Sequence, residues 1–172
     1  MQAASPEKLT RRQSREWALQ LLFQLDMNPA RETGIDAILD AFWNLQWTTG
    51  NDEMRGEPES ADDVAPPKAR AFAEQLVKGV LQHRAEIDAL FPAYVRNWTV
   101  NRVGAVERNV LRLAFYEIFH SDGTPPVVVL NEAIDLAKYY SNSESGRFIN
   151  GVLDRAIKDA PQKKRGTPPP KN

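Results

Sequence analysis

Four basic side chains near the N-terminus are the first residues whose types and spacing could do chemistry. Lys8, Arg11, Arg12 and Arg15 lie at the start of a predicted helix, where cations oppose the positive end of the helix dipole. Arg11 and Arg15 are also like charges four residues apart, which destabilises a helix by about 0.2–0.5 kcal/mol. Such local conflicts often mark functional sites, and bound phosphates would relieve the repulsion. The cluster predicts a polyanion site, with a solvated helix end as the alternative.

A second candidate site combines aromatic rings, a basic residue and small polar side chains. Tyr139, Tyr140, Arg147 and Phe148 bracket residues 141–146, which are rich in serine and asparagine. Aromatic rings stack on single-stranded bases with about 1–3 kcal/mol per base, and small polar side chains reach phosphates and base edges. The pattern indicates single-stranded nucleic-acid binding. The alternative is that Tyr140 and Phe148 are core residues at helix ends.

Catalytic and metal-binding patterns are weak in this chain. His83 and His120 have no acidic partner at metal-ligand spacing in the sequence, and glycine-rich phosphate loops and nucleophile elbows are absent. Glu132 and Asp135 are expected to lie on a helix, with Asp135 pairing with Lys138 three residues later. We therefore expect no enzyme activity, no metal and no cofactor.

Composition indicates a cytoplasmic protein. The chain has 172 residues and no cysteine, which excludes disulfides. No apolar run approaches the roughly 20 residues of a membrane span, and the N-terminus lacks a signal-peptide core. The net charge is -1, but residues 48–67 carry about -5 and residues 161–172 about +4. Any case for nucleic-acid binding must therefore rest on local clusters.

Helical periodicity of apolar residues organises most of the chain. The predicted helices cover about 11–27, 32–47, 68 towards 90, 104–120, 126–140 and 144–158. Thr10 and Gln13 form a capping-box pattern for the first helix. The third helix either continues or bends towards Leu90, and Pro92 is expected to interrupt it. Residues 127–129 are all valine and alone would favour a strand, but the following apolar spacing favours helix.

Residues 104–120 are apolar on nearly every side, which predicts a central, buried helix. Two groups of three helices flanking it would be a natural packing. Gly151 lies inside the last predicted helix at a cost of about 1 kcal/mol relative to alanine. Close packing against another helix would explain that glycine.

Three blocks in the second half carry a family resemblance. They are Glu107-Arg-Asn-Val-Leu-Arg-Leu-Ala-Phe-Tyr-Glu117, Asn131-Glu-Ala-Ile-Asp-Leu-Ala-Lys138 and Phe148-Ile-Asn-Gly-Val-Leu-Asp154. Their order and spacing resemble the C-terminal half of the NusB family of transcription antitermination factors. A looser match covers residues 11–26, and the closer one covers about 73–157.

The resemblance implies an all-α fold of about seven helices in two packed helical bundles. Residues 11–160 would form this domain, after a flexible N-terminal arm at 1–10. Residues 48–67 would be an acidic, flexible insert, and 161–172 a disordered basic tail. Both of these segments look like additions to the family pattern.

The resemblance also implies a function. Members bind the boxA element of nascent ribosomal RNA transcripts with NusE, a ribosomal small-subunit protein, and help RNA polymerase read through terminators. Glu107 and Val110 would contact NusE, Val110 from an exposed helix edge. The expected RNA contacts combine the N-terminal basic cluster with residues around the 141–146 loop. They are Lys8, Arg11, Arg12, Arg15, Tyr140, Glu144, Ser145, Arg147 and Phe148.

Two other functions stay open at the level of sequence. The same fold resembles the non-catalytic N-terminal module of certain ribosomal RNA cytosine methyltransferases, although no cofactor-binding βαβ unit follows it here. A protein-interaction module without useful RNA affinity is the other alternative. It could be a homodimer that buries the arginine surface.

Overall fold

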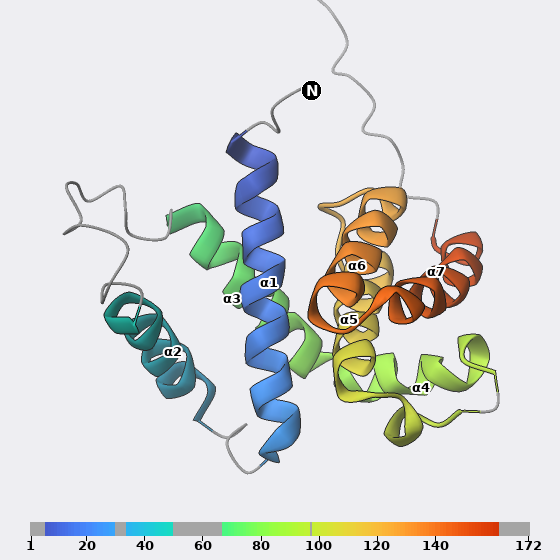
Figure 1. Ribbon diagram of the computed structural model, residues 1–172, viewed down its shortest axis with the longest axis horizontal. Coiled ribbons are helices and arrows are strands. Elements are labelled where there is room, and N and C mark those ends of the chain that lie inside the picture. The colour runs from blue at the N-terminus through green and yellow to red at the C-terminus, as the bar shows by residue number, and fades with distance from the viewer. Residues whose placement is uncertain (1–5, 30–33, 50–66, 97, 162–172) are drawn as a thin grey trace, which may run out of the picture.

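The computed structural model describes residues 6–29, 34–49, 67–96 and 98–161, and these form an all-α fold (Figure 1). This confirms the predicted fold class. The α-helices are α1 (Pro6–Met27), α2 (Ile35–Thr49), α3 (Pro67–Gln82), α4 (Arg84–Tyr94), α5 (Ala105–Phe115), α6 (Pro126–Tyr140) and α7 (Ser143–Lys158). A 3-10 turn, η3 (Val100–Arg102), precedes α5, and a π-helix, η4 (Tyr116–His120), continues it.

The centre of the fold is α5, as its sequence predicts. It contacts α1 and α3 on one side and α4, α6 and α7 on the other (Figure 1). Leu111 and Phe115 have no exposed surface, and Phe115 packs edge-on against Phe91 of α4 with ring centroids 5.6 Å apart. The two predicted groups of helices therefore meet around α5.

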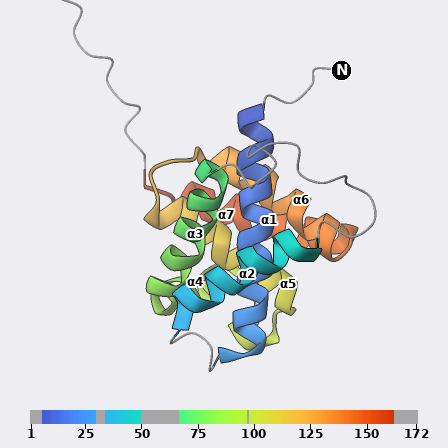
Figure 2. The ribbon, with the colours of Figure 1, turned by 90° about the vertical axis from the view of Figure 1, so that its left-hand side faces the viewer.

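The outer face of α1 and α3 is covered by α2 (Figure 2). Trp43 of α2 anchors it, because its ring meets Trp17 of α1 edge-on at 5.3 Å and its Nε1 donates to Glu74 Oε1 of α3 at 2.8 Å. Leu45, near the end of α2, is 58% exposed, although its spacing from Ile38 and Phe42 would place it on the buried side of a regular helix.

Two predicted helix boundaries are wrong. The first helix begins at Pro6, so the predicted arm at 1–10 is helical from Pro6 and Thr10 is not a cap. Proline suits this first position because its φ is already helical and its missing N–H needs no partner there. The third predicted helix bends at His83, between α3 and α4, but it is not interrupted at Pro92, because α4 runs two residues past that proline to Tyr94.

The valine-rich start of α6 is helical, which confirms the helix and excludes the strand for residues 127–129. Pro126 occupies the first turn. Val127 and Val128 are exposed, while Val129 is buried at 2% exposure. Burying one of the three is what a helix placed against α5 requires.

The two glycines with opposite surroundings are Gly79 and Gly151. A Cβ at Gly79 would collide with the ring of Tyr116, so this glycine lets α3 approach η4 closely. Gly151 is exposed, and a Cβ there would meet nothing within 4 Å. The prediction that Gly151 lies in a close helix contact is therefore wrong.

The central helix is not apolar throughout, because it carries buried charges paired with α1 and α4. Arg112 Nε donates to Asp88 Oδ1 at 2.8 Å and Nη1 to Asp26 Oδ1 at 2.9 Å. Arg108 Nε donates to Asp26 Oδ2 at 2.9 Å, and Asn109 Nδ2 to the same oxygen at 3.1 Å. Buried charges need such partners, so this network links the two halves of the fold.

Several predicted segments fall outside the described residues. Helix α2 extends to Thr49 and α3 begins at Pro67. The predicted acidic insert at 48–67 therefore lies outside the described residues except at its two ends. The basic tail also lies outside beyond residue 161, as do residues 1–5. Within the described ranges, no helix is long and apolar enough to cross a membrane.

Candidate nucleic-acid interface

Arg15 belongs to the core and not to an exposed basic surface. Its side chain is 3% exposed, and its Nε donates to Glu117 Oε1 at 2.8 Å. Nη1 lies 3.9 Å from Glu132 Oε2 of α6. The predicted RNA contact of Arg15 is therefore not accessible in this structure, because the guanidinium is enclosed by acidic partners.

The acidic residues of α6 face α1, and the predicted pair between Asp135 and Lys138 is replaced by pairs with arginines. Arg12 Nη1 lies 3.5 Å from Asp135 Oδ2 and Nε 3.7 Å from Glu16 Oε1. The Arg12 side chain is still 43% exposed. It can therefore reach a ligand while it stays beside Asp135.

Arg11 is the most accessible described member of the N-terminal cluster. It is exposed, and its guanidinium lies 4.9 Å from the centre of the Phe72 ring. A cation held over an aromatic face keeps its hydrogen-bond donors available at the edge. The side chain of Lys8 lies outside the described residues.

Two tyrosines end α6 with different roles. Tyr140 is half-buried, and its hydroxyl accepts from Gln20 Nε2 of α1 at 3.0 Å. Burial raises the pKa of Tyr140, so the hydroxyl stays protonated. Tyr139 is 75% exposed and meets the Tyr140 ring edge-on at 5.0 Å. Tyr139 is therefore the ring of this pair that is free to stack on a base.

The loop between α6 and α7 is ordered by Glu107 of α5. Ser141 Oγ donates to Glu107 Oε1 at 2.9 Å, and Ser145 Oγ donates to the same oxygen. Asn142 caps α7 by accepting from the Ser145 backbone N–H at 2.9 Å. Burial alone would raise the pKa of Glu107, but the bonds from Ser145 and Ser141 outweigh it and the pKa is lowered. Glu107 is therefore a carboxylate at neutral pH.

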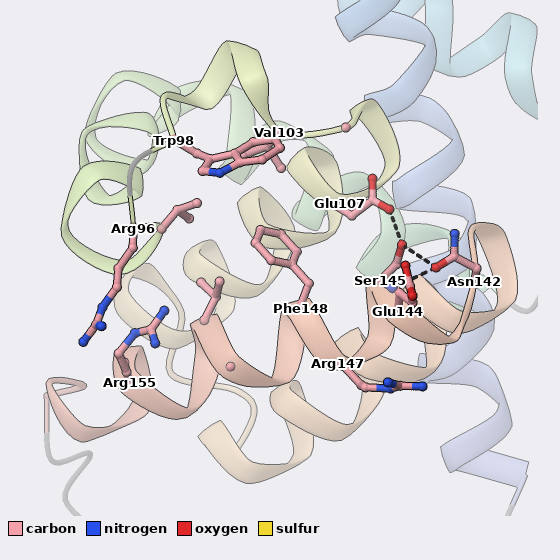
Figure 3. Close-up of a pocket in the computed structure, with 14 residues that line it drawn as sticks. Arg96, Trp98, Val103, Glu107, Asn142, Glu144, Ser145, Arg147, Phe148 and Arg155 are labelled. Atoms are coloured by element: carbon pink, nitrogen blue, oxygen red, sulfur yellow. Dashed lines mark hydrogen bonds between the residues drawn. The ribbon is translucent and has the colours of Figure 1, made fainter.

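A pocket of about 650 Å³ opens beside this loop (Figure 3). Figure 3 shows Phe148 pointing from α7 toward Trp98 and Val103. Arg96 and Arg155 lie at the far end from Glu107 in that view. The lining residues are Val95, Arg96, Trp98, Val103, Gly104, Glu107, Asn142, Glu144, Ser145, Arg147, Phe148, Gly151, Val152 and Arg155. Aromatic walls with cationic groups at the edge suit an unpaired base and its phosphates.

The structure brings together residues that the sequence assigned to different surfaces. Glu107, expected to contact a protein, lines the same pocket as Glu144, Arg147 and Phe148, which were expected to contact RNA. Ser145 lies there too but is only 7% exposed. A single concave surface can therefore serve both kinds of partner.

Val110 is not part of any exposed edge. It is 1% exposed and belongs to the hydrophobic core. The expectation that it lies on an exposed helix edge is wrong, because the face of α5 that carries Val110 packs inside the domain. Glu107, three residues earlier on the same helix, lies at the pocket instead.

Three charged or aromatic residues of the pocket were missed from the sequence. Arg96, Trp98 and Arg155 come from the α4–η3 connection and from the last turn of α7. Arg155 Nη2 donates to the Tyr94 carbonyl at 2.6 Å, which holds that connection against α7. The sequence did contain a pattern that could have identified Arg96 and Trp98. A basic residue lies close to an aromatic one, as at Arg147 and Phe148, and Trp98 is 52% exposed.

The two histidines also meet, contrary to the prediction that they lack an acidic partner. His83 Nδ1 and His120 Nδ1 each lie 3.8 Å from Glu86 Oε2. His83 lies between α3 and α4, Glu86 lies in the first turn of α4, and His120 ends η4. This cluster is separate from the pocket.

Comparison with known proteins gives one consistent answer. The family model described as the NusB family matches residues 12–158. A curated relative, the transcription antitermination protein NusB of Symbiobacterium thermophilum, is 41% identical over 87% of this chain and 90% of its own length.

Solved structures agree with the sequence relatives. A structure described as T. maritima NusB is 31% identical with a TM-score of 0.69, covering 94% of this chain and 96% of its own. Another, described as the antitermination factors NusB and NusE in complex with dsRNA, is 25% identical with a TM-score of 0.66. It covers 87% of this chain and 97% of that one.

Proposed function

This chain belongs to the NusB family, and from that premise we propose that it is a transcription antitermination factor that binds RNA together with NusE. The observation that carries the proposal is the family match over residues 12–158, shared with curated antitermination proteins. A relative of the same fold is described in complex with NusE and RNA. The role is one of binding within the RNA polymerase antitermination complex and includes no catalytic step.

The proposed RNA is a single-stranded boxA element. Single-stranded elements are recognised by stacking of bases on aromatic rings and by contacts to their exposed edges. The pocket supports this, because Phe148 and the exposed Trp98 line it together. We assign base stacking to this pair and to Tyr139.

Phosphate contacts are assigned to exposed arginines. Arg11, Arg96 and Arg147 are exposed, and none of them forms an ion pair within the part of the chain that the structure describes. Arg12 joins them because its side chain is 43% exposed beside Asp135. Four such contacts to a single strand give a slope of log affinity against log salt near -3.

The NusE surface is assigned to the rim of the pocket around Glu107. Its carboxylate is held in place by Ser141 and Ser145 and is charged at neutral pH. Fixed acidic groups at an interface steer and orient a basic partner. A ribosomal protein such as NusE would be a partner of this kind. RNA along the arginines and protein at Glu107 would then meet at the same pocket.

The test is fluorescence anisotropy of a labelled boxA RNA and a scrambled RNA of equal length, with and without NusE, at two salt concentrations. The expected result is tighter, salt-sensitive binding to boxA that strengthens when NusE is added. Weak binding that is equal for both RNAs and unaffected by NusE would contradict the proposed function.

A further inference from the structure

His83, Glu86 and His120 form a compact cluster on the side of α3, α4 and η4. Their ligand-type atoms all lie within 4.8 Å of one another. Both histidine Nδ1 atoms face the same carboxylate oxygen of Glu86 at 3.8 Å. The two histidines and the carboxylate therefore place three ligand-type atoms close together.

Packing holds the two imidazoles in this arrangement. The rings of His83 and His120 are stacked, with centroids 4.3 Å apart and planes at 22°. Tyr116 stacks on both, at 6.1 Å from His83 and 6.5 Å from His120. Because Tyr116 in turn fills the space left by Gly79, the rings are positioned by the core.

An unsatisfied atom points to a missing partner. His83 Nδ1 is a buried side-chain atom with no hydrogen-bond partner, and its 3.8 Å separation from Glu86 is too long for a hydrogen bond. Buried polar atoms are nearly always satisfied, so an exception needs an explanation. A cation between the nitrogens and the carboxylate would satisfy all three groups.

The ligand set indicates which cation. Two imidazoles and one carboxylate bind Zn²⁺ at about 2.0–2.2 Å in sites that keep a fourth position open for water or another ligand. Ligand atoms around such an ion lie roughly 3.3–3.6 Å apart, so the two 3.8 Å separations from Glu86 and any wider separation between the histidines, which is at most 4.8 Å, must shorten when the ion binds. Glu86 is 69% exposed and is free to make that movement.

We propose that His83, Glu86 and His120 bind one divalent transition metal, Zn²⁺ being the best match, through three protein ligands and one exchangeable position. The bound metal would tie the α3–α4 junction and the first turn of α4 to the end of η4. Neither the RNA surface nor the proposed function is needed for this inference.

The amino-acid composition limits the number of competing zinc ligands in the test. The sequence contains two histidines and no cysteine, so the nitrogen and sulfur side chains that favour zinc are confined to this cluster. Untagged protein, treated with a chelator and dialysed, is titrated with zinc chloride by isothermal titration calorimetry. Cobalt chloride is added in parallel, because a tetrahedral Co²⁺ site absorbs in the visible range.

The expected result is one zinc per chain and a tetrahedral Co²⁺ spectrum. His120→Gln and Glu86→Gln should each weaken zinc binding by at least about tenfold, since losing even an outer partner of a metal costs that much. Asp122→Asn removes an exposed carboxylate two residues from His120 and serves as the matched control, with unchanged binding.

Two outcomes would overturn the proposal. One is the absence of zinc binding at millimolar concentration. The other is binding of equal strength in the wild type, His120→Gln and Glu86→Gln. Glu86 is mostly exposed, so its glutamine variant will fold, and circular dichroism spectra would establish this for every variant.

Discussion

Arg15 of α1 and Glu117 of η4 form a buried, bidentate ion pair. Arg15 Nε donates to one carboxylate oxygen and Nη2 to the other, each at 2.8 Å. The two side chains are 3% and 2% exposed. Since α1 begins at Pro6, Arg15 lies well inside the helix, where Glu117 neutralises its charge, and that charge serves the fold.

Arg15→Ala should destabilise the protein by about 3–5 kcal/mol, because it leaves Glu117 buried without its partner. Arg12→Ala is the matched control on the same helix, and its exposed pair should cost less than about 1 kcal/mol. Urea unfolding followed by circular dichroism measures both. Unchanged stability of Arg15→Ala together with lost RNA binding would instead make Arg15 an RNA contact.

The second prediction concerns how the stability contributed by Asp26 depends on pH. Burial alone would raise the pKa of Asp26, but hydrogen bonds from Arg108, Arg112 and Asn109 outweigh it, so the folded pKa lies below the usual value of about 3.8. The carboxylate therefore contributes stability that is fully present above that value and is lost as pH falls through the folded pKa. Asp26→Asn removes this contribution and should be less stable than the wild type at pH 7.

Unfolding of both proteins between pH 7 and pH 3 checks this prediction. The stability difference between wild type and Asp26→Asn, about 3 kcal/mol at pH 7, should shrink at the acid end. Asp154→Asn is the control, because its pair with Lys158 is exposed and it should follow the wild type throughout. A difference that stays constant with pH would contradict the role of the Asp26 charge.

The third prediction separates two helical glycines. Gly79→Ala should destabilise the protein by about 1–3 kcal/mol, since the new methyl group would meet the Tyr116 ring. Gly151→Ala should stabilise it by up to about 1 kcal/mol, because the position is open and alanine is the better helix former. Thermal unfolding curves of the two variants should shift in opposite directions.

The fourth prediction tests the pocket as an RNA site. Arg147→Ala should weaken binding to boxA and scrambled RNA alike and make the salt slope shallower by about 0.7. Lys158→Ala removes the same charge at the far end of α7 and should change little. Phe148→Ala should cost boxA binding about 1–3 kcal/mol if a base stacks on the ring. Equal losses of Phe148→Ala on both RNAs would identify it as a packing residue.

Local sequence patterns were sufficient for most of the helices and for the centre of the fold. The helical spacing of Ala18, Leu21 and Leu25 indicates the buried side of α1, and all three are at most 2% exposed. The largely apolar 104–120 segment predicted a central helix, which α5 and η4 form. These features follow from the repeat of the helix, which links residues three and four positions apart.

Only the tertiary structure decided which polar residues are free to bind a ligand. Sequence spacing could not show that Arg15 meets Glu117, that Val110 is buried, or that Glu107 holds Ser145. Sequence spacing also could not show that the His83 ring stacks on the His120 ring. Such pairings depend on the rotation and crossing of whole helices, which sets the partner of each side chain across distances that no local repeat can reach.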